Sequence, residues 1–207
     1  NDGGIDTGRL NWKDPLLYQN DNVLGMSWSS NVGLKSDGTG YINTNFNPST
    51  DGVKHLVDDF SVMVSSNQRS TTSVAGLYGI DNSPTSPREW FSSYWSALTT
   101  LRFYTDNAEL ASKTAISRAN ANYQFSRDSE VVTQKSVYQN GVDLGVTGPT
   151  STANVFPNRD YYFLANNRAS GVSQVSDEGI QFGAFGSGLK NKSVEYSAGI
   201  NTYLNAL

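Results

Sequence analysis

The stretch that decides the fold lies near the C-terminus and reads Glu178-Gly-Ile-Gln-Phe-Gly-Ala-Phe-Gly-Ser-Gly-Leu189. Its residues alternate, so that Ile180 and Phe182 point to one side of an extended chain and Phe185 points to the other. Because both sides carry apolar groups, we expect a strand inside a packed sheet that is covered on each face. The glycines, Gly183 first, would allow a bend, a bulge or the close approach of a neighbouring segment.

The residues after this strand change to helical periodicity. Asn191 or Ser193 could cap the start of a helix. The apolar residues that then fall on one stripe are Tyr196, Ile200, Tyr203, Leu204 and Leu207. The pattern predicts one C-terminal helix, packed against an otherwise all-β domain.

Composition supports many short strands joined by polar turns. The chain has 207 residues, with 19 glycines and 11 tyrosines but only 16% charged residues. The net charge of −4 argues against a nucleic-acid partner, which needs clustered Lys and Arg. There is no cysteine, so no disulfide contributes to stability, and no apolar run is long enough for insertion into a membrane.

The first 22 residues differ from the rest of the chain. Residues 1–22 are rich in Asp, Asn and Gly, with a few aromatic anchors such as Trp12. We expect either an extended arm that docks by those anchors or a linker from a preceding domain, with one domain over residues 23–207. Because the chain opens with Asn1, we expect a processed product or an excised domain.

Turn signals and alternation predict about ten strands. Residues 60–66 and 73–80 should be strands that pair with each other, and Asn140-Gly141 is a strong hairpin signal because a type I′ turn needs positive φ twice. Residues 108–117 could form a short helix or an irregular loop. Further strands are expected at 23–30, 41–44, 90–95, 98–104, 122–126, 130–138 and 161–165.

The order of these segments resembles a known family. The segments that carry the resemblance are Asp37-Gly-Thr-Gly40, Tyr41-Ile-Asn-Thr-Asn-Phe46, Val137-Tyr-Gln-Asn-Gly-Val142, Asn158-Arg-Asp-Tyr-Tyr-Phe-Leu-Ala-Asn-Asn167, Phe182-Gly-Ala-Phe-Gly-Ser-Gly-Leu189 and Ile200-Asn-Thr-Tyr-Leu204. From Leu34 to Leu207 the chain resembles the concanavalin A-like (laminin G-like) jelly-roll domains of bacterial surface proteins and bacteriophage structural proteins. It departs from them at Lys190-Asn-Lys-Ser193, where such domains often have a Thr-Asp-x-Glu capping box.

The resemblance implies an all-β fold: a two-sheet antiparallel jelly-roll sandwich with one C-terminal α-helix. Such domains carry binding sites on the concave sheet or on the loops at one end. Some relatives are lectins and others are glycoside hydrolases or polysaccharide lyases, so the fold alone does not choose a function.

The residues that enzymes of this fold use are missing. No Glu-x-Asp-x-x-Glu run places three carboxylates on one face, and Asp58 and Asp59 are adjacent, so on a strand they would point to opposite faces. The single histidine, His55, has no Gln at the offset that alginate-lyase-type sites require, and we interpret it as a solvated or turn residue. We therefore expect no catalytic residues and no enzyme activity.

No cofactor is predicted, although calcium is possible because Asp, Asn and carbonyl oxygens are sufficient ligands for it. Asp81 and Asp177 are the candidate ligands. The alternative for each is a turn residue that bonds its own backbone.

Aromatic and amide side chains remain as candidate ligand-binding residues. Sugars stack on flat rings, while amides and guanidinium groups bind their hydroxyls. The alternative for the two tryptophans is a place in the core, and we expect Tyr161-Tyr162-Phe163 to be core residues. The candidate binding residues are Trp90, Tyr94, Trp95, Arg88, Arg102, Asn166, Asn167 and Arg168.

These features favour a non-catalytic carbohydrate-binding or adhesion module of a surface or virion protein. Its partner would be a carbohydrate or host-surface glycan, and its location extracellular, on a cell surface or on a virion. The alternative is a structural module that contacts other subunits of a phage or surface assembly. A glycan-cleaving enzyme is the third and least favoured hypothesis.

Overall fold

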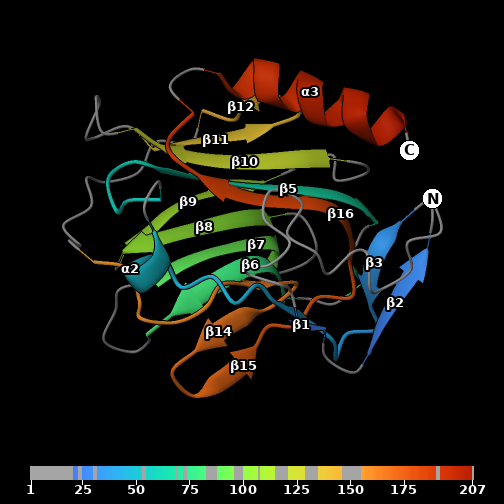
Figure 1. Cartoon of the computed structure of the whole chain (residues 1–207), viewed down its shortest axis with the longest axis vertical. Helices are drawn as coiled ribbons and strands as arrows, with labels where there is room; N and C mark the ends of the chain where they lie inside the picture. The colour runs from blue at the N-terminus through green and yellow to red at the C-terminus, as the bar shows by residue number, and fades with distance from the viewer. Residues whose placement is uncertain are drawn as a thin grey trace.

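The computed structural model describes two β-sheets that pack face to face, with a helix beside one of them (Figure 1). An all-β sandwich is therefore confirmed. The described residues are 21–22, 25–29, 32–52, 55–68, 70–71, 74–82, 88–95, 100–106, 108–114, 121–128, 135–145, 155–189 and 192–206.

The nine-stranded sheet contains the strands that matter most for the candidate site. β14 (Asn166–Arg168) runs parallel to β6 (Val74–Asp81) and pairs with β15 (Gly171–Ser173). The main path of this sheet is β1 (Asp21–Asn22), β4 (Ile42–Asn43), β13 (Tyr162–Phe163), β6 (Val74–Asp81), β7 (Arg88–Trp95), β8 (Thr100–Asp106) and β9 (Ala108–Thr114).

The seven-stranded sheet is built around the stretch Glu178–Leu189. In that stretch, β16 (Gly179–Gly186) lies beside β5 (Phe60–Gln68) along most of its length. It lies beside β3 (Gly33–Ser36) only at Gly179 and Ile180. The prediction that residues 60–66 pair with residues 73–80 is wrong, because β5 and β6 belong to different sheets. The order is β12 (Val142–Asp143), β11 (Lys135–Gln139), β10 (Ala121–Arg127), β5 (Phe60–Gln68), β16 (Gly179–Gly186), β3 (Gly33–Ser36) and β2 (Met26–Ser29).

The core fills the space between the sheets with aromatic rings. A Cβ on Gly183 would lie only 2.5 Å from the ring of Phe163, so this glycine lets the opposite sheet approach closely. Phe185 stacks on Phe163 and Tyr161, with ring centroids 5.1 Å and 4.6 Å apart. The close approach expected of the glycines is therefore made by a side chain from the facing sheet. Beyond Ile180, β16 is only partly buried, so the expectation that both its faces are covered holds only at its start.

Two helices are present in the described residues, where one was expected. The additional helix is α2 (Pro48–Asp51), whose first turn is capped by Asn47 Oδ1 accepting from the Ser49 N–H at 3.0 Å. The predicted C-terminal helix is α3 (Ser193–Asn205), and its N-cap residue is Lys192, with no side-chain cap.

The predicted apolar stripe of α3 is only partly buried. Ile200 is buried, but Tyr196 is 50% exposed. Ser193 and Ser197 occupy the buried side instead, because the face of β10 beneath the helix is polar. Leu207 lies outside the described residues.

Three local predictions can be compared directly with the backbone. The Asn140-Gly141 hairpin is confirmed, with φ of 52° and 81°. The helix or loop expected at 108–117 is instead strand β9, and Asn166–Arg168, which lie beyond the strand expected at 161–165, form strand β14. Both are specified by pairing with a neighbouring strand, β8 for the first and β6 for the second, which local sequence does not reveal. No helix in the described part of the chain is long and apolar enough to span a membrane.

Candidate functional site

Two tyrosines form a stacked pair on the outer face of the nine-stranded sheet. Tyr41, just before β4, and Tyr162 on β13 have ring centroids 4.6 Å apart and planes inclined by 23°. Phe163 points into the core toward Gly183, so Tyr162, one residue earlier on the strand, points away from it. Both tyrosines are half-buried, which leaves part of their surface open to solvent.

The hydroxyl of Tyr162 remains protonated at physiological pH. Burial first, and then the neighbouring Tyr41 through proximity and a side-chain hydrogen bond, raise the pKa of Tyr162 to about 12. Asp160 acts in the same direction, and Arg159 opposes it. The phenol is thus a neutral group that can donate a hydrogen bond, with the Asp160 carboxylate and the Arg159 guanidinium close enough to influence it.

The polar residues around the pair are held by their own hydrogen bonds. Asn43 lies directly opposite Tyr162 in the strand register, and its Oδ1 accepts from the N–H of Asn45 at 2.9 Å. Asn45 has φ of 53°, a conformation that Asn tolerates well in tight turns. Arg159 Nε donates to Asn82 Oδ1 at 3.0 Å, so this side chain is anchored at one nitrogen.

The register of the sheet connects this pair to a predicted site residue. Directly paired residues of antiparallel strands share a face of the sheet and interact across it. Tyr162 and Trp90 both pair with Gly79, from opposite sides of β6, so they are two strands apart, or about 10 Å. The full row of paired residues is Asp21, Asn43, Tyr162, Gly79, Trp90, Tyr104 and Glu109.

Five of the predicted site residues lie on two adjacent strands. Arg88, Trp90, Tyr94 and Trp95 are in β7, and Arg102 is in β8. Arg88 pairs with Asp81 and Trp95 pairs with Val74, so these two lie at opposite ends of β7. The side chains of these five residues lie outside the described part of the structure, so their role stays a prediction.

The other three predicted residues lie in β14. Arg168 Nε forms an ion pair with Asp81 Oδ2 at 3.1 Å, and Asp81 is only 2% exposed. Asn166 is buried, and its Nδ2 donates to Gln174 Oε1 at 3.3 Å. Asn167 is half-buried and donates to the backbone oxygen of Asp160 at 2.9 Å. Asn167 is therefore connected to the surroundings of the tyrosine pair by its hydrogen bond to Asp160. Asn166, in contrast, is buried and forms its hydrogen bond within the fold.

The two candidate calcium ligands have protein partners. Asp81 binds Arg168, and Asp177 accepts from the N–H of Thr71 at 2.9 Å and from the hydroxyls of Ser70 and Thr71. Burial works to raise the pKa of Asp177, but these hydrogen bonds outweigh it and lower the pKa below the usual value. Within the described ranges, no three His, Asp or Glu side chains gather as metal ligands. Calcium binding stays a prediction.

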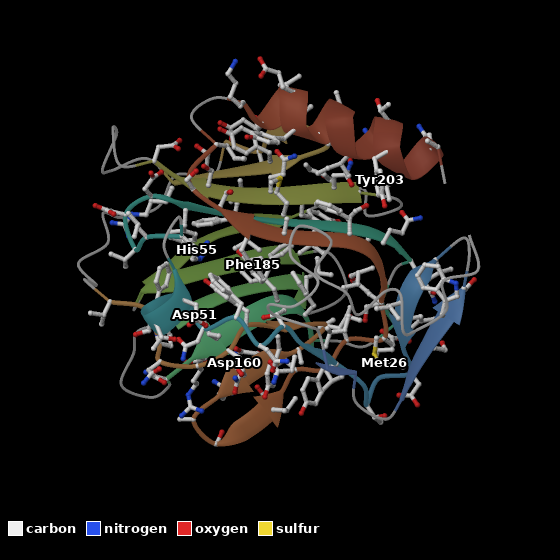
Figure 2. All side chains as sticks on the ribbon, viewed as in Figure 1. Met26, Asp51, His55, Asp160, Phe185 and Tyr203 are labelled. Carbon is white, nitrogen blue, oxygen red and sulfur yellow. The ribbon has the colours of Figure 1, made fainter. Side chains whose placement is uncertain are left out.

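His55 belongs to the core, so its interpretation as a solvated or turn residue is wrong. It is 2% exposed, with Nδ1 3.2 Å from the Gly186 carbonyl and Nε2 3.1 Å from the Tyr161 hydroxyl. Because a carbonyl only accepts, Nδ1 donates and Nε2 accepts from Tyr161. Burial lowers the pKa of His55 to about 3, so the ring is neutral. Figure 2 shows His55 beside Phe185, between the sheets.

Two carboxylates approach each other near the end of β16. Asp59 Oδ1 accepts from the Gly188 N–H at 2.8 Å. Asp59 Oδ1 and Asp128 Oδ1 both lie closer than 3.0 Å to the point where a Cβ on Gly188 would stand. The glycine therefore makes room for two half-buried acids that the sequence does not place together.

Sequence reasoning missed the tyrosine pair. Tyr162 was expected in the core with its neighbours, but only Tyr161 and Phe163 are there. The alternation itself could have found it, since two core residues on either side of Tyr162 force it to the other face. The stacking of Tyr41 on Tyr162 depends on pairing between β4 and β13, which are far apart in sequence.

No family model matches the chain, and no curated protein matches it. Among solved structures, domain 4 of AbnA, a GH43 extracellular arabinanase from Geobacillus stearothermophilus, in complex with arabinotriose, is similar at a TM-score of 0.58 and 16% identity over 87% of this chain and 88% of that chain. The CBM40 of Ruminococcus gnavus IT-sialidase, bound to α2,3 sialyllactose, has a TM-score of 0.53 and 13% identity over 73% and 90% of the two chains.

A third similar structure is much longer than this chain. A mutant of Trypanosoma rangeli sialidase that displays trans-sialidase activity has a TM-score of 0.60 and 12% identity, and the match covers 84% of this chain but only 28% of the sialidase. At these identities the likeness shows the fold alone, a β-sandwich.

Proposed function

We propose that this chain is a non-catalytic carbohydrate-binding module whose glycan stacks on the Tyr41–Tyr162 pair. The observation that carries the proposal is a half-buried aromatic pair on the outer face of a sheet, bordered by fixed amide and charged groups. Sugar rings present C–H faces that pack on aromatic surfaces, while hydroxyls need donors and acceptors at the edge. Asn43, Arg159 and Asp160 supply that edge.

Two of the similar structures support this choice of ligand class. The arabinanase domain is in complex with arabinotriose and the CBM40 is bound to sialyllactose, and each match covers most of both chains. A sandwich of this kind therefore accommodates glycan ligands in proteins of similar size. We extend the proposal to the whole domain, residues 23–207, as an adhesion module of an extracellular, surface or virion protein.

We propose that the predicted site residues of β7, β8 and β14 extend the binding surface. Trp90 is the strongest of them, because it occupies the same row of the sheet as Tyr162. Arg168 and Arg88 both pair with Asp81 in the register, so they would form one end of this surface. Tyr94, Trp95, Arg102 and Asn167 are its remaining members, and a calcium ion at Asp81 or Asp177 stays part of the proposal.

One observation favours a different activity. Asp59 and Asp128 converge at Gly188, and two carboxyl groups that flank a glycosidic bond are the catalytic arrangement of most glycosidases. A second alternative, a module that contacts other subunits, draws on the exposed apolar residues Val142 and Val194, which are 66% and 64% exposed.

A glycan array distinguishes these functions. We expect the wild type to retain a defined set of glycans, Tyr162→Ala to lose them, and Tyr196→Ala to behave like the wild type, because Tyr196 is an exposed tyrosine on α3, away from the pair. An array with no retained glycan would contradict the proposal. Release of shortened glycans by the wild type, abolished in Asp59→Asn, would establish the glycosidase instead.

A further inference from the structure

Helix α3 turns a polar side toward the seven-stranded sheet. Its buried residues are Ser193, Ser197 and Ile200, and only the last is apolar. The apolar side chains of Val194 and Tyr196 are 64% and 50% exposed. Figure 1 shows α3 alongside β10 and β11 at one border of the molecule. Little apolar surface is therefore removed from water where this helix meets the sheet.

Polar residues of β10 form the other half of this contact. Asn122 Nδ2 donates to Asn201 Oδ1 at 2.5 Å. Gln124, which is fully buried, satisfies both ends of its amide when it donates to the Ser193 carbonyl at 3.1 Å and accepts from the Ser197 N–H at 3.2 Å. The helix is thus held by hydrogen bonds of side-chain amides, which water replaces at small net cost when the contact opens.

The closed position of α3 has several unfavourable features. The Ser197 hydroxyl is buried with no hydrogen-bond partner in the described structure. Lys192 provides no side-chain cap, and Gly199 lowers helix propensity in the middle of the helix. The buried cluster that fills the space between the sheets, as far as it is described, includes no residue of α3. Detachment of α3 from the seven-stranded sheet would therefore leave that cluster intact.

We propose that α3 is a lid that opens as a unit while the sandwich stays folded. Opening would uncover Asn122 and Gln124, the two β10 side chains that contact the helix. Both are buried in the closed state, and they lie on either side of the core residue Tyr123 along the strand. The uncovered surface offers side-chain amide groups, which is the chemistry that binds polyhydroxylated ligands.

An engineered disulfide tests this lid. A Cβ on Gly141 would lie 3.3 Å from the Cβ of Ser197, near the separation of about 3.8 Å that disulfides prefer. The chain has no cysteine, so Gly141→Cys combined with Ser197→Cys can form only this one bridge within a molecule. Gly141 has φ of 81°, where Cys is strained, so the reduced form of the same variant is the matched control.

Hydrogen exchange of backbone amides is the measurement. In the wild type and the reduced variant we expect α3 amides to exchange at least about 100-fold faster than those of β5 and β10, since local opening needs no global unfolding. Oxidation should slow α3 exchange at least about tenfold and leave the strands unchanged. The proposal that α3 opens as a lid would be overturned by equal exchange rates of α3 and β10 in the wild type, or by an α3 exchange rate that oxidation does not change.

A second variant keeps the test independent of the disulfide. Gln124→Ala removes hydrogen bonds that only the closed helix uses, so α3 exchange should rise about tenfold while strand exchange stays the same. If exchange in α3 and in the strands rises together, the helix is an integral part of the sandwich and the proposal fails.

Discussion

Burial of one neutral imidazole makes the stability of this fold sensitive to pH. His55 has a pKa of about 3 in the folded chain, against 6.5 as its ordinary value. Between these two pH values the unfolded chain binds a proton that the folded chain does not, so the free energy of unfolding falls as the pH falls. The rings around it are those of Phe46, Phe60, Phe156, Tyr161 and Phe185.

We predict that the free energy of unfolding decreases by about 2 kcal/mol between pH 7 and pH 5, at about 1.4 kcal/mol per pH unit below 6.5. Urea unfolding at both pH values measures it. The control is His55→Gln, which can donate to the Gly186 carbonyl and accept from Tyr161 but does not titrate. Because the chain has one histidine, the variant should lose this dependence, and an unchanged pH slope in the variant would contradict the assignment.

The burial of a single side chain could not be predicted from the sequence when distant residues cause it. His55 stands in a short segment of mixed polar and apolar residues, and its burial results from aromatic residues contributed by distant parts of the chain. The Asn140-Gly141 turn, in contrast, was predictable because its two positive φ values need only local residues.

Substitution by alanine should have opposite effects on stability at one glycine in a strand and at one glycine in a helix. In β16, Gly183 faces the Phe163 ring at a distance that leaves no room for a methyl group, and the ring is fixed by stacking on Phe185. In α3, Gly199 has open space around its missing Cβ.

We predict that Gly183→Ala lowers the free energy of unfolding by about 1–3 kcal/mol through overpacking. Gly199→Ala should raise the stability of α3 by about 0.5–1 kcal/mol, because alanine costs less backbone entropy in a helix. Thermal unfolding measures the first substitution and hydrogen exchange of α3 measures the second. A neutral Gly183→Ala would mean that Phe163 can move away.

Elements with strong local signals were predictable, and elements defined by pairing were not. The alternation over Ile180–Phe185 identified β16, and helical spacing identified α3. The strand β9 has few β-branched residues and forms only because β8 offers an edge. The face that α3 buries was mispredicted because the sheet beneath it is polar, which no periodicity within the helix reports.

At the scale of the whole molecule, the candidate site depends on contacts between distant segments. Tyr41 meets Tyr162 because β4 pairs with β13, and Trp90 joins their row because β13 and β7 both flank β6. The sequence predicted a binding site of aromatic and amide side chains that includes Trp90, and that role stays a prediction, but the sequence could not assemble the tyrosine pair. The sandwich provides the frame, and the residues on one face of it provide the proposed function.

Calorimetric titration of a glycan selected on the array, against four forms of the chain, tests the central claim most directly. We predict that Tyr41→Ala and Tyr162→Ala each weaken binding about tenfold or more, through loss of stacking surface. Tyr162→Phe and the control Tyr196→Ala, compared with the wild type, should keep the affinity within about threefold, because the ring is retained in one and the pair is untouched in the other.

The ratio of the Kd of Tyr162→Ala to that of the wild type decides whether the glycan binds on the tyrosine pair. An increase of about tenfold, with thermal unfolding unchanged, is the result that a glycan stacked on the tyrosine pair requires. Equal dissociation constants for the wild type and Tyr162→Ala would contradict it and place the ligand on another surface of the sandwich.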